Sequence, residues 1–72
     1  MDHRVFARRL RRMRAKRGIS CRVLSELCGL SPGAVARYEN GRCRNVPARC
    51  VAALAEELGV SVDWLLGLDK KP

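Results

Sequence analysis

The sequence has few aromatic residues, a single histidine and no long apolar run. Its only aromatic side chains are Phe6, Tyr38 and Trp64, so the core of a folded domain must consist mainly of aliphatic residues. The longest apolar stretches are only a few residues, too short for a secretory signal or a membrane-spanning helix. We therefore expect a cytoplasmic protein without membrane association.

The chain also lacks the residue patterns of an active site. Its 72 residues can form one domain with a small core, which leaves little room for a second site of any depth. There are no paired carboxylates, no nucleophile matched with a base and no phosphate-cradling glycine loop. We expect a single domain over residues 1–68, a frayed tail over residues 69–72, and neither enzymatic activity nor a cofactor.

The four cysteines, Cys21, Cys28, Cys43 and Cys50, are seven residues apart within each pair. Zinc ligands usually stand about two to four residues apart, and His3 is the only histidine, so we expect no metal site. Cys28 and Cys50 fall on apolar helix faces and are expected in the core. Cys21 and Cys43 are expected to be exposed, at a helix start and between two arginines, settings that lower a thiol pKa. A redox-responsive role and inert reduced thiols are both open for these two residues.

Positive charge is in excess, and it is concentrated at the start of the chain. The net charge is +8, and residues 1–17 hold eight basic side chains against the single acidic residue Asp2. The other 55 residues hold seven basic and six acidic side chains. Such a field attracts polyanions, of which nucleic acid is the most common, although an anionic membrane or an acidic protein would also respond.

Serine, aspartate or proline residues precede the apolar-periodic segments and glycines follow them, a pattern typical of capped short helices. Ser31 and Pro32 form a clear helix start, because proline at the first helical position gives up an amide that has no partner there. Strand alternation is missing, so the sequence predicts a compact all-α bundle of five helices. The expected helices cover about residues 3–17, 21–28, 32–40, 47–58 and 62–66.

Only Gly29 and Leu30 lie between the second predicted helix and Ser31, which starts the third, and this is too short for an antiparallel hairpin and fits two helices that cross steeply. Small Ser25 falls where the helices come close, and Gly29 falls where the turn favours a positive φ. The sequence therefore predicts a helix-turn-helix over residues 21–40. Its apolar positions are Leu24, Cys28, Leu30, Val35 and Tyr38.

These features resemble the phage-repressor and Cro family of helix-turn-helix regulators, the Xre type, over about residues 4–67. The resemblance rests on the segments Arg14-Ala15-Lys16-Arg17-Gly18-Ile19-Ser20, Gly29-Leu30-Ser31-Pro32, Tyr38-Glu39-Asn40-Gly41-Arg42 and Leu58-Gly59-Val60-Ser61-Val62-Asp63-Trp64-Leu65-Leu66. It implies a fold like that of the phage-repressor DNA-binding domain, with double-stranded DNA as the partner and the third helix in the major groove.

The resemblance also implies roles for individual residues. An ion pair between Arg14 and Glu39 is expected to brace the first helix against the third, with two solvated surface charges as the alternative. The expected base-contact residues are Ser31, Pro32, Gly33, Ala36 and Arg37. The expected phosphate-contact residues are Cys21, Arg22, Asn40, Arg42 and Arg44. Independently of the resemblance, the charge of the first helix leads us to expect phosphate contacts from Lys16 and Arg17 at its end and general attraction from its other arginines. The expected dimer contacts are Val62, Asp63, Leu65 and Leu66.

The third helix departs from the family pattern, because Pro32, Gly33 and Ala34 stand where polar side chains usually read bases. Cys21 likewise replaces the usual glutamine at the start of the second helix. Only Arg37 can form the bidentate contact to guanine, and Ala34 or Ala36 could touch a thymine methyl group. We therefore expect a shallow base preference, with affinity from phosphate contacts and selectivity from Arg37, half-site spacing and DNA shape.

The sequence as a whole favours a transcriptional regulator, expected to be a repressor that binds a palindromic operator as a weak homodimer. The alternative is a protein-interaction module, such as an antitoxin or an accessory regulator, that masks a protein partner. The weak base-reading chemistry of the third helix favours this alternative.

Overall fold

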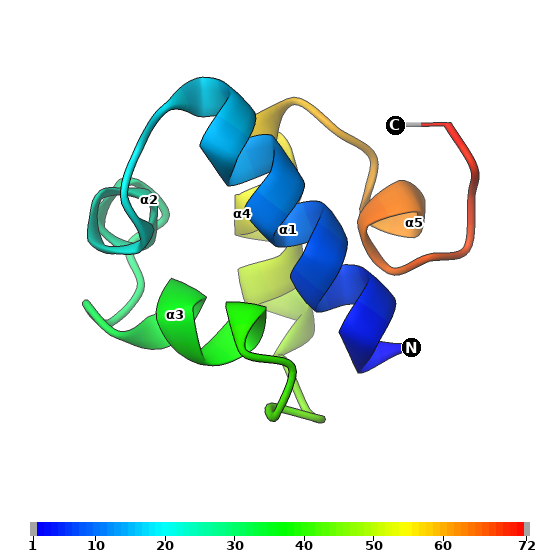
Figure 1. Ribbon diagram of the computed structural model, residues 1–72, viewed down its shortest axis with the longest axis horizontal. Coiled ribbons are helices and arrows are strands. Elements are labelled where there is room, and N and C mark those ends of the chain that lie inside the picture. Colours follow the sequence, from blue (N-terminus) through cyan, green and yellow to red (C-terminus); the bar gives the residue numbers. More distant parts are fainter. Residues whose placement is uncertain (1, 72) are drawn as a thin grey trace.

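Five helices form the regular structure of residues 2–71, the part of the chain that the computed structural model describes (Figure 1). They are α1 (His3–Arg17), α2 (Cys21–Leu27), α3 (Ala34–Glu39), α4 (Ala48–Leu58) and α5 (Val62–Leu65). No strand occurs among these residues, so the expected all-α fold of five helices is confirmed. In the same part of the chain, no helix has the length and apolar character needed to cross a membrane.

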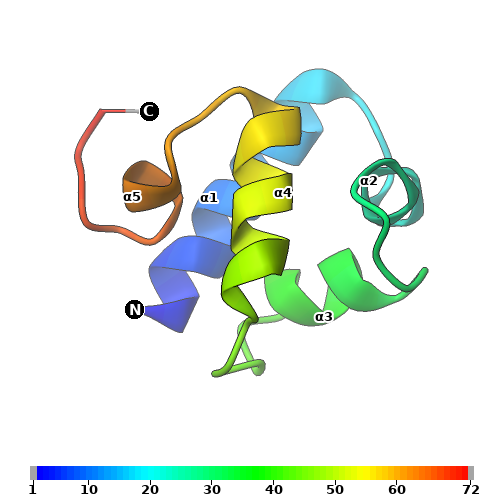
Figure 2. The same cartoon turned by 180° about the vertical axis from the view of Figure 1, so that it is seen from behind.

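Helices α1 and α4 cross at the centre of the molecule, with the α2–α3 pair on one side and α5 on the other (Figures 1 and 2). Aliphatic residues fill the core between them, and the rings of Phe6 and Tyr38 pack at a tilt with their centroids 6.1 Å apart. The side chains without exposed surface include Leu10, Leu24, Val35, Leu54 and Leu65. As the composition predicts, the interior is mainly aliphatic.

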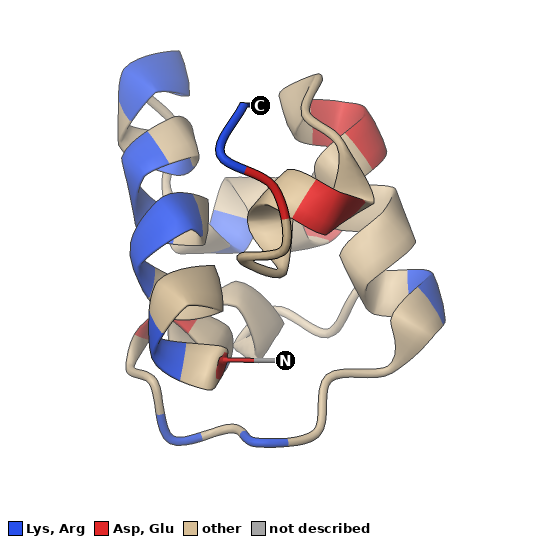
Figure 3. Cartoon of the chain, turned by 90° about the vertical axis from the view of Figure 1, so that its right-hand side faces the viewer, with Lys and Arg blue, Asp and Glu red and all other residues tan. Residues whose placement is uncertain are grey.

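Helix α1 begins where Asp2 caps it. The Asp2 carboxylate accepts hydrogen bonds from the amides of Arg4 (3.0 Å) and Val5 (3.3 Å), and these bonds hold its pKa below the usual value. One face of α1 buries Phe6 and Leu10 against the core. Figure 3 shows many of the basic residues along α1, whereas three of the acidic residues, Glu56, Glu57 and Asp63, lie on α4 and α5. The positive charge that the sequence concentrates in residues 1–17 therefore also lies on one part of the folded molecule, along α1.

Helix α3 begins at Ala34, two residues later than expected, and Ser31 does not cap it. The backbone carbonyl of Ser31 instead accepts from the amide of Ala34 (3.0 Å), which makes a turn of Ser31, Pro32 and Gly33. The carbonyl of Gly33 then accepts the first α-helical bond, from Arg37 (3.1 Å). Smaller differences occur elsewhere, since α4 begins one residue after Pro47 and α5 ends one residue before Leu66.

Ser25 supplies the cap that α3 lacks locally. Its side chain is fully buried at the crossing of α2 and α3, where the hydroxyl donates to the carbonyl of Cys21 (2.8 Å) and accepts from the amide of Val35 (3.1 Å). Gly33 has no side chain to satisfy that amide, so the bond must come from α2. In the turn between the helices, Gly29 has a φ of +69°, as predicted. The angle between α2 and α3 is thus held by a hydrogen bond as well as by packing.

Replacing Ser25 with alanine should lower the free energy of unfolding by about 1–3 kcal/mol, because the buried amide of Val35 loses its acceptor. Urea denaturation followed by circular dichroism would measure the loss. Ser31→Ala is the matched control, since the exposed Ser31 hydroxyl caps nothing and its removal should cost less than about 0.5 kcal/mol. Equal stability of the two variants would contradict the assigned cap.

Arg9 fastens α1 to the C-terminal end of the chain. Its guanidinium lies 4.8 Å from the centroid of the Trp64 ring and donates to the backbone carbonyls of Trp64 and Asp69, the latter at 2.8 Å. Asp69 is the first residue of the expected tail over residues 69–72. Pro72, like Met1 at the start of the expected domain, lies outside the described residues.

Candidate nucleic-acid interface

The outward face of α3 carries the expected base-contact residues. Helix α3 buries Ala34, Val35 and Tyr38 against the rest of the molecule and leaves Ala36 and Arg37 exposed. The preceding turn of residues 31–33 is exposed over its whole length. Ala34 is only 2% exposed, so the expectation that it could touch a thymine methyl group is wrong, and Ala36 alone keeps that role.

Two depressions of about 290 Å³ each flank the C-terminal half of α3. Asn40 lines both. On the side of α1 and α2 its neighbours include Cys21 and Ala36, and on the loop side they are Arg37, Arg42 and Cys43. The structure therefore gathers expected base-contact and phosphate-contact residues around one end of α3.

The turn of residues 40–42 after α3 carries exposed hydrogen-bond donors. The side-chain oxygen of Asn40 accepts from the amide of Arg42 (2.9 Å), and Gly41 between them has a φ of +76°. Because the oxygen is engaged in the turn, the exposed amide nitrogen of Asn40 remains to donate. Arg42 is exposed as well and lines the same depression as Asn40. An anion such as a phosphate group suits this arrangement.

Arg14 and Glu39 join α1 to α3 through the ion pair that the resemblance implies. The guanidinium makes two bonds to the carboxylate, at 2.6 and 3.0 Å, and a third to the carbonyl of Ile19 at 2.8 Å. The side chains are 18% and 7% exposed, and the hydrogen bond to Glu39 raises the pKa of Arg14. Arg11 is more loosely associated, 3.9 Å from Glu39 and largely exposed. The pair fixes α3 and neutralises a carboxylate that would otherwise repel phosphate.

A family model described as a helix-turn-helix domain matches residues 5–66, which include nearly all of the five helices. The chain belongs to this helix-turn-helix family. Membership supports DNA binding and agrees with the crossing of α2 and α3 and with the donors around α3. Comparison with curated proteins and with solved structures gave no match.

Other expected phosphate contacts of this helix-turn-helix domain lie outside the depressions around α3. Arg17 donates to the carbonyl of Glu57 (2.6 Å) and pairs with its carboxylate (3.8 Å), so it faces the end of α4. Arg22 pairs with Glu26 at 3.3 Å, but both side chains are more than half exposed and free to separate. Lys16 is exposed on α1, and Arg44 borders a groove beside α5. Their contacts with DNA stay predictions.

The expected dimer residues divide into exposed and buried positions. Leu65 has no exposed surface, so its expected contact with a second chain is wrong: the single turn of α5 points it into the core. Val62 is 38% exposed, Asp63 is exposed and Leu66 is partly buried. Val62 and Leu66 line a groove of about 510 Å³ with the loop before α4 and the start of α4.

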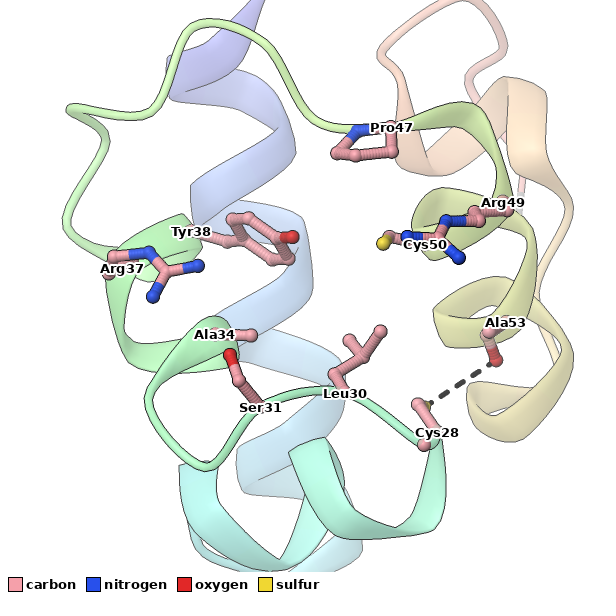
Figure 4. Close-up of a pocket in the computed structure, with 11 residues that line it drawn as sticks. Cys28, Leu30, Ser31, Ala34, Arg37, Tyr38, Pro47, Arg49, Cys50 and Ala53 are labelled. Atoms are coloured by element: carbon pink, nitrogen blue, oxygen red, sulfur yellow. Dashed lines mark hydrogen bonds between the residues drawn. The ribbon is translucent and has the colours of Figure 1, made fainter.

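Arg49 is a candidate contact that the sequence reasoning missed. It is exposed in the first turn of α4 and, with Ser31 and Arg37, lines a depression of about 410 Å³ between α3 and α4. Figure 4 shows Arg37 and Arg49 on opposite sides of this depression. No ion pair engages either guanidinium among residues 2–71. A basic side chain just after Pro47, close to the basic loop, was the signal available in the sequence.

The cysteines differ from expectation in their chemistry. Burial, and then the negative charge of Glu39, raises the pKa of the Cys21 thiol, so the expected lowering is wrong. Cys21 and Cys43 are half-buried rather than exposed, and Cys43 donates to the carbonyl of Asn45 (3.4 Å). Cys50 lies in the core as expected, and the half-buried Cys28, whose pKa burial also raises, donates to the carbonyl of Ala53 (3.6 Å; Figure 4).

Cys21 should therefore react slowly with electrophiles. Its raised pKa leaves less thiolate than an unstructured cysteine has, and the thiolate is the reacting form. Alkylation with iodoacetamide at about pH 8, followed by peptide mass spectrometry, should label Cys21 more slowly than a reference peptide with one free cysteine. Labelling faster than that peptide would restore the reactive-thiol interpretation.

Proposed function

We propose that this helix-turn-helix domain is a transcriptional regulator of the phage-repressor, or Xre, type that inserts α3 into the major groove. The observation that carries the proposal is the outward face of α3, where Ala36, Arg37 and the preceding turn are all exposed. The Ser25 hydrogen bond and the Arg14–Glu39 pair support α3 from behind. A recognition helix needs this combination of free surface and rigid support.

Most of the affinity comes from phosphate contacts, and most of the selectivity from a single residue. Asn40, Arg42 and Arg49 donate to phosphates on both sides of α3, and these contacts bind any sequence. Arg37 is the one exposed side chain of α3 that can make a bidentate contact to guanine. Pro32, Gly33 and Ala36 bring the backbone close to the DNA but read little, so base preference is shallow.

The regulator acts in the cytoplasm as a homodimer and represses by occupying a palindromic operator. Two copies meet through α5 and the groove beside it, where Val62 and Leu66 present apolar surface. A two-fold dimer places its recognition helices about 34 Å apart, one turn of DNA. The contact is small, so the dimer is weak in solution and forms chiefly on the operator.

Val62→Asp tests the dimer. The charge should lower affinity for a two-half-site operator at least about tenfold and leave affinity for a single half-site nearly unchanged, because only the contact between copies is lost. Electrophoretic mobility shift with both duplexes measures the two affinities. If both fall equally, or neither falls, the α5 contact is assigned wrongly.

A second candidate function is a protein-interaction module, such as an antitoxin or an accessory regulator. Two observations favour it. Helix α2 exposes Val23 (42%) and Leu27 (54%) one turn apart, and the start of α3 presents Pro32 and Gly33 in place of polar side chains. An exposed apolar pair on a short helix suits a protein partner better than it suits DNA.

Binding to random and to selected duplexes over a range of salt concentrations tests the regulator against the interaction module. A regulator should enrich a motif from a random pool at low salt, and the logarithm of its affinity should fall steeply with the logarithm of salt concentration. If no motif is enriched even at low salt, the proposal fails and the interaction module becomes the better account.

A further inference from the structure

Four basic side chains form a row along the outer side of α1. Arg4, Arg8, Arg12 and Lys16 recur every four residues, so they form an inclined ridge on the helix, each about 6 Å along its axis and about 40° around it from the one before. All four are exposed. Helix α1 contains no acidic residue, and within residues 2–71 no ion pair engages any of the four. We call Arg4, Arg8, Arg12 and Lys16 the α1 row.

Three other arginines of α1 form hydrogen bonds or ion pairs with the rest of the molecule. Arg9 binds backbone carbonyls near α5, Arg14 pairs with Glu39, and Arg17 binds Glu57 at the end of α4. Each therefore has a structural use. The α1 row has no such use, and its charges repel one another along the helix. A surface of this kind costs stability unless an anion covers it.

The middle of the α1 row, Arg8 and Arg12, faces away from the recognition helix. Arg14 marks the side of α1 that contacts α3, and at about 100° per residue Arg8 and Arg12 point about 120–160° away from it. In Figure 3 the basic outer edge of α1 likewise runs along the side of the molecule opposite the acidic residues of α4 and α5. A duplex bound at α3 therefore leaves Arg8 and Arg12, the middle of the α1 row, open.

The chemistry of the row fits a nucleic-acid backbone. Three of its four residues are arginine, which binds phosphate bidentately. The row is about 18 Å long, and a DNA strand rises about 3.4 Å along the duplex axis per phosphate, so the few phosphates on the near side of one strand lie within its reach. A membrane surface fits less well, because the apolar face of α1, including Phe6 and Leu10, is already buried in the core and cannot insert.

We infer that the α1 row binds the phosphate backbone of a second DNA duplex, so that one chain bridges two duplexes. The inference rests on the proposed function for the first duplex, which α3 holds. The second contact involves phosphates alone and is therefore independent of sequence. The protein would then hold two DNA segments together in addition to binding its operator.

Capture of one duplex by another tests the inference. A selected duplex is immobilised and loaded with protein, unbound protein is washed away, and a labelled duplex of unrelated sequence is added. The row variant is Arg8→Gln with Arg12→Gln. Its matched control, Lys70→Gln with Lys71→Gln, removes the same charge from the other end of the chain. Lys16 is kept in both, since it is also an expected contact for the first duplex.

The wild-type chain and the Lys70/Lys71 control should capture the labelled duplex. The row variant should load onto the immobilised duplex nearly as well as wild type but capture about tenfold less of the labelled duplex. The slope of the logarithm of capture against the logarithm of salt concentration should be smaller in magnitude by about 2. Val62→Asp, applied at a higher concentration so that it loads the immobilised duplex to the same extent, should still capture, because both surfaces belong to one chain. If the wild-type chain loads but does not capture, or if the row variant captures as much as the control, the bridging inference is wrong. The proposed function would still stand.

Two other outcomes also count against it. If the wild-type chain does not load onto the immobilised duplex, both the bridging and the proposed function fail. If the row variant differs from wild type only in binding vesicles that contain about 30% phosphatidylserine, the row serves a membrane surface and not DNA.

Discussion

Replacing Arg14 with alanine is expected to lower the free energy of unfolding by about 3 kcal/mol. The substitution removes three hydrogen bonds, two to Glu39 and one to the carbonyl of Ile19, and leaves a carboxylate that is only 7% exposed without its partner. A domain of this size has a total stability of only about 5–10 kcal/mol, so the loss is a large share of it. The recognition helix should lose its brace to α1 at the same time.

Urea denaturation of Arg14→Ala, Glu39→Ala and the double variant measures this effect. The double variant should be more stable than the sum of the single losses predicts, because it leaves no unpaired buried charge. Arg22→Ala is the control, since it breaks an exposed pair with Glu26 and should cost less than about 0.5 kcal/mol. If Arg14→Ala costs no more than this control, the pair does not support α3.

Arg37→Ala should relax the base preference of the protein. Arg37 is the only exposed long basic side chain within α3, and a bidentate contact to guanine contributes about 1–3 kcal/mol of discrimination, or about 5- to 150-fold. Little else on α3 can compensate. Sequencing of DNA selected from a random pool should therefore show one conserved guanine per half-site for wild type and none at that position for the variant.

Arg42→Ala is the matched comparison, because it removes the same type of side chain from the turn after α3. It should weaken binding to all sequences by a similar factor and lower the salt slope by about 1, with the selected motif unchanged. An unchanged motif for Arg37→Ala, or an altered motif for Arg42→Ala, would show that the two roles are assigned wrongly.

Local signals predicted most of the fold, and long-range contacts account for the errors. Asp2 and the glycines marked helix ends correctly because capping depends on neighbouring residues. Ser31 and Pro32 are an equally good local signal, but the amide of Val35 is satisfied by Ser25, ten residues earlier, and α3 starts at Ala34. Leu65 was misplaced because α5 is a single turn, too short for periodicity to identify its buried side.

At the candidate site, the sequence predicted which residues are exposed better than it predicted which groups their side chains bind. Exposure of residues 31–33, Ala36 and Arg37 follows from the register of α3. The engagement of Arg9 and Arg17 could not be predicted, because each binds backbone carbonyls at least 40 residues away that any residue could supply. The raised pKa of Cys21 depends on its burial and on Glu39, and both arise only when α1, α2 and α3 pack together.

The most direct test of the central claim, that α3 is the DNA-binding surface, is an amide chemical-shift titration of the ¹⁵N-labelled chain with one equivalent of a selected duplex. The largest shifts are expected in residues 31–37, in Asn40 and Arg42 after α3, and at Arg49. Shifts confined to Val23 and Leu27 on α2, or to α5, would contradict the claim and move the binding surface elsewhere on the domain.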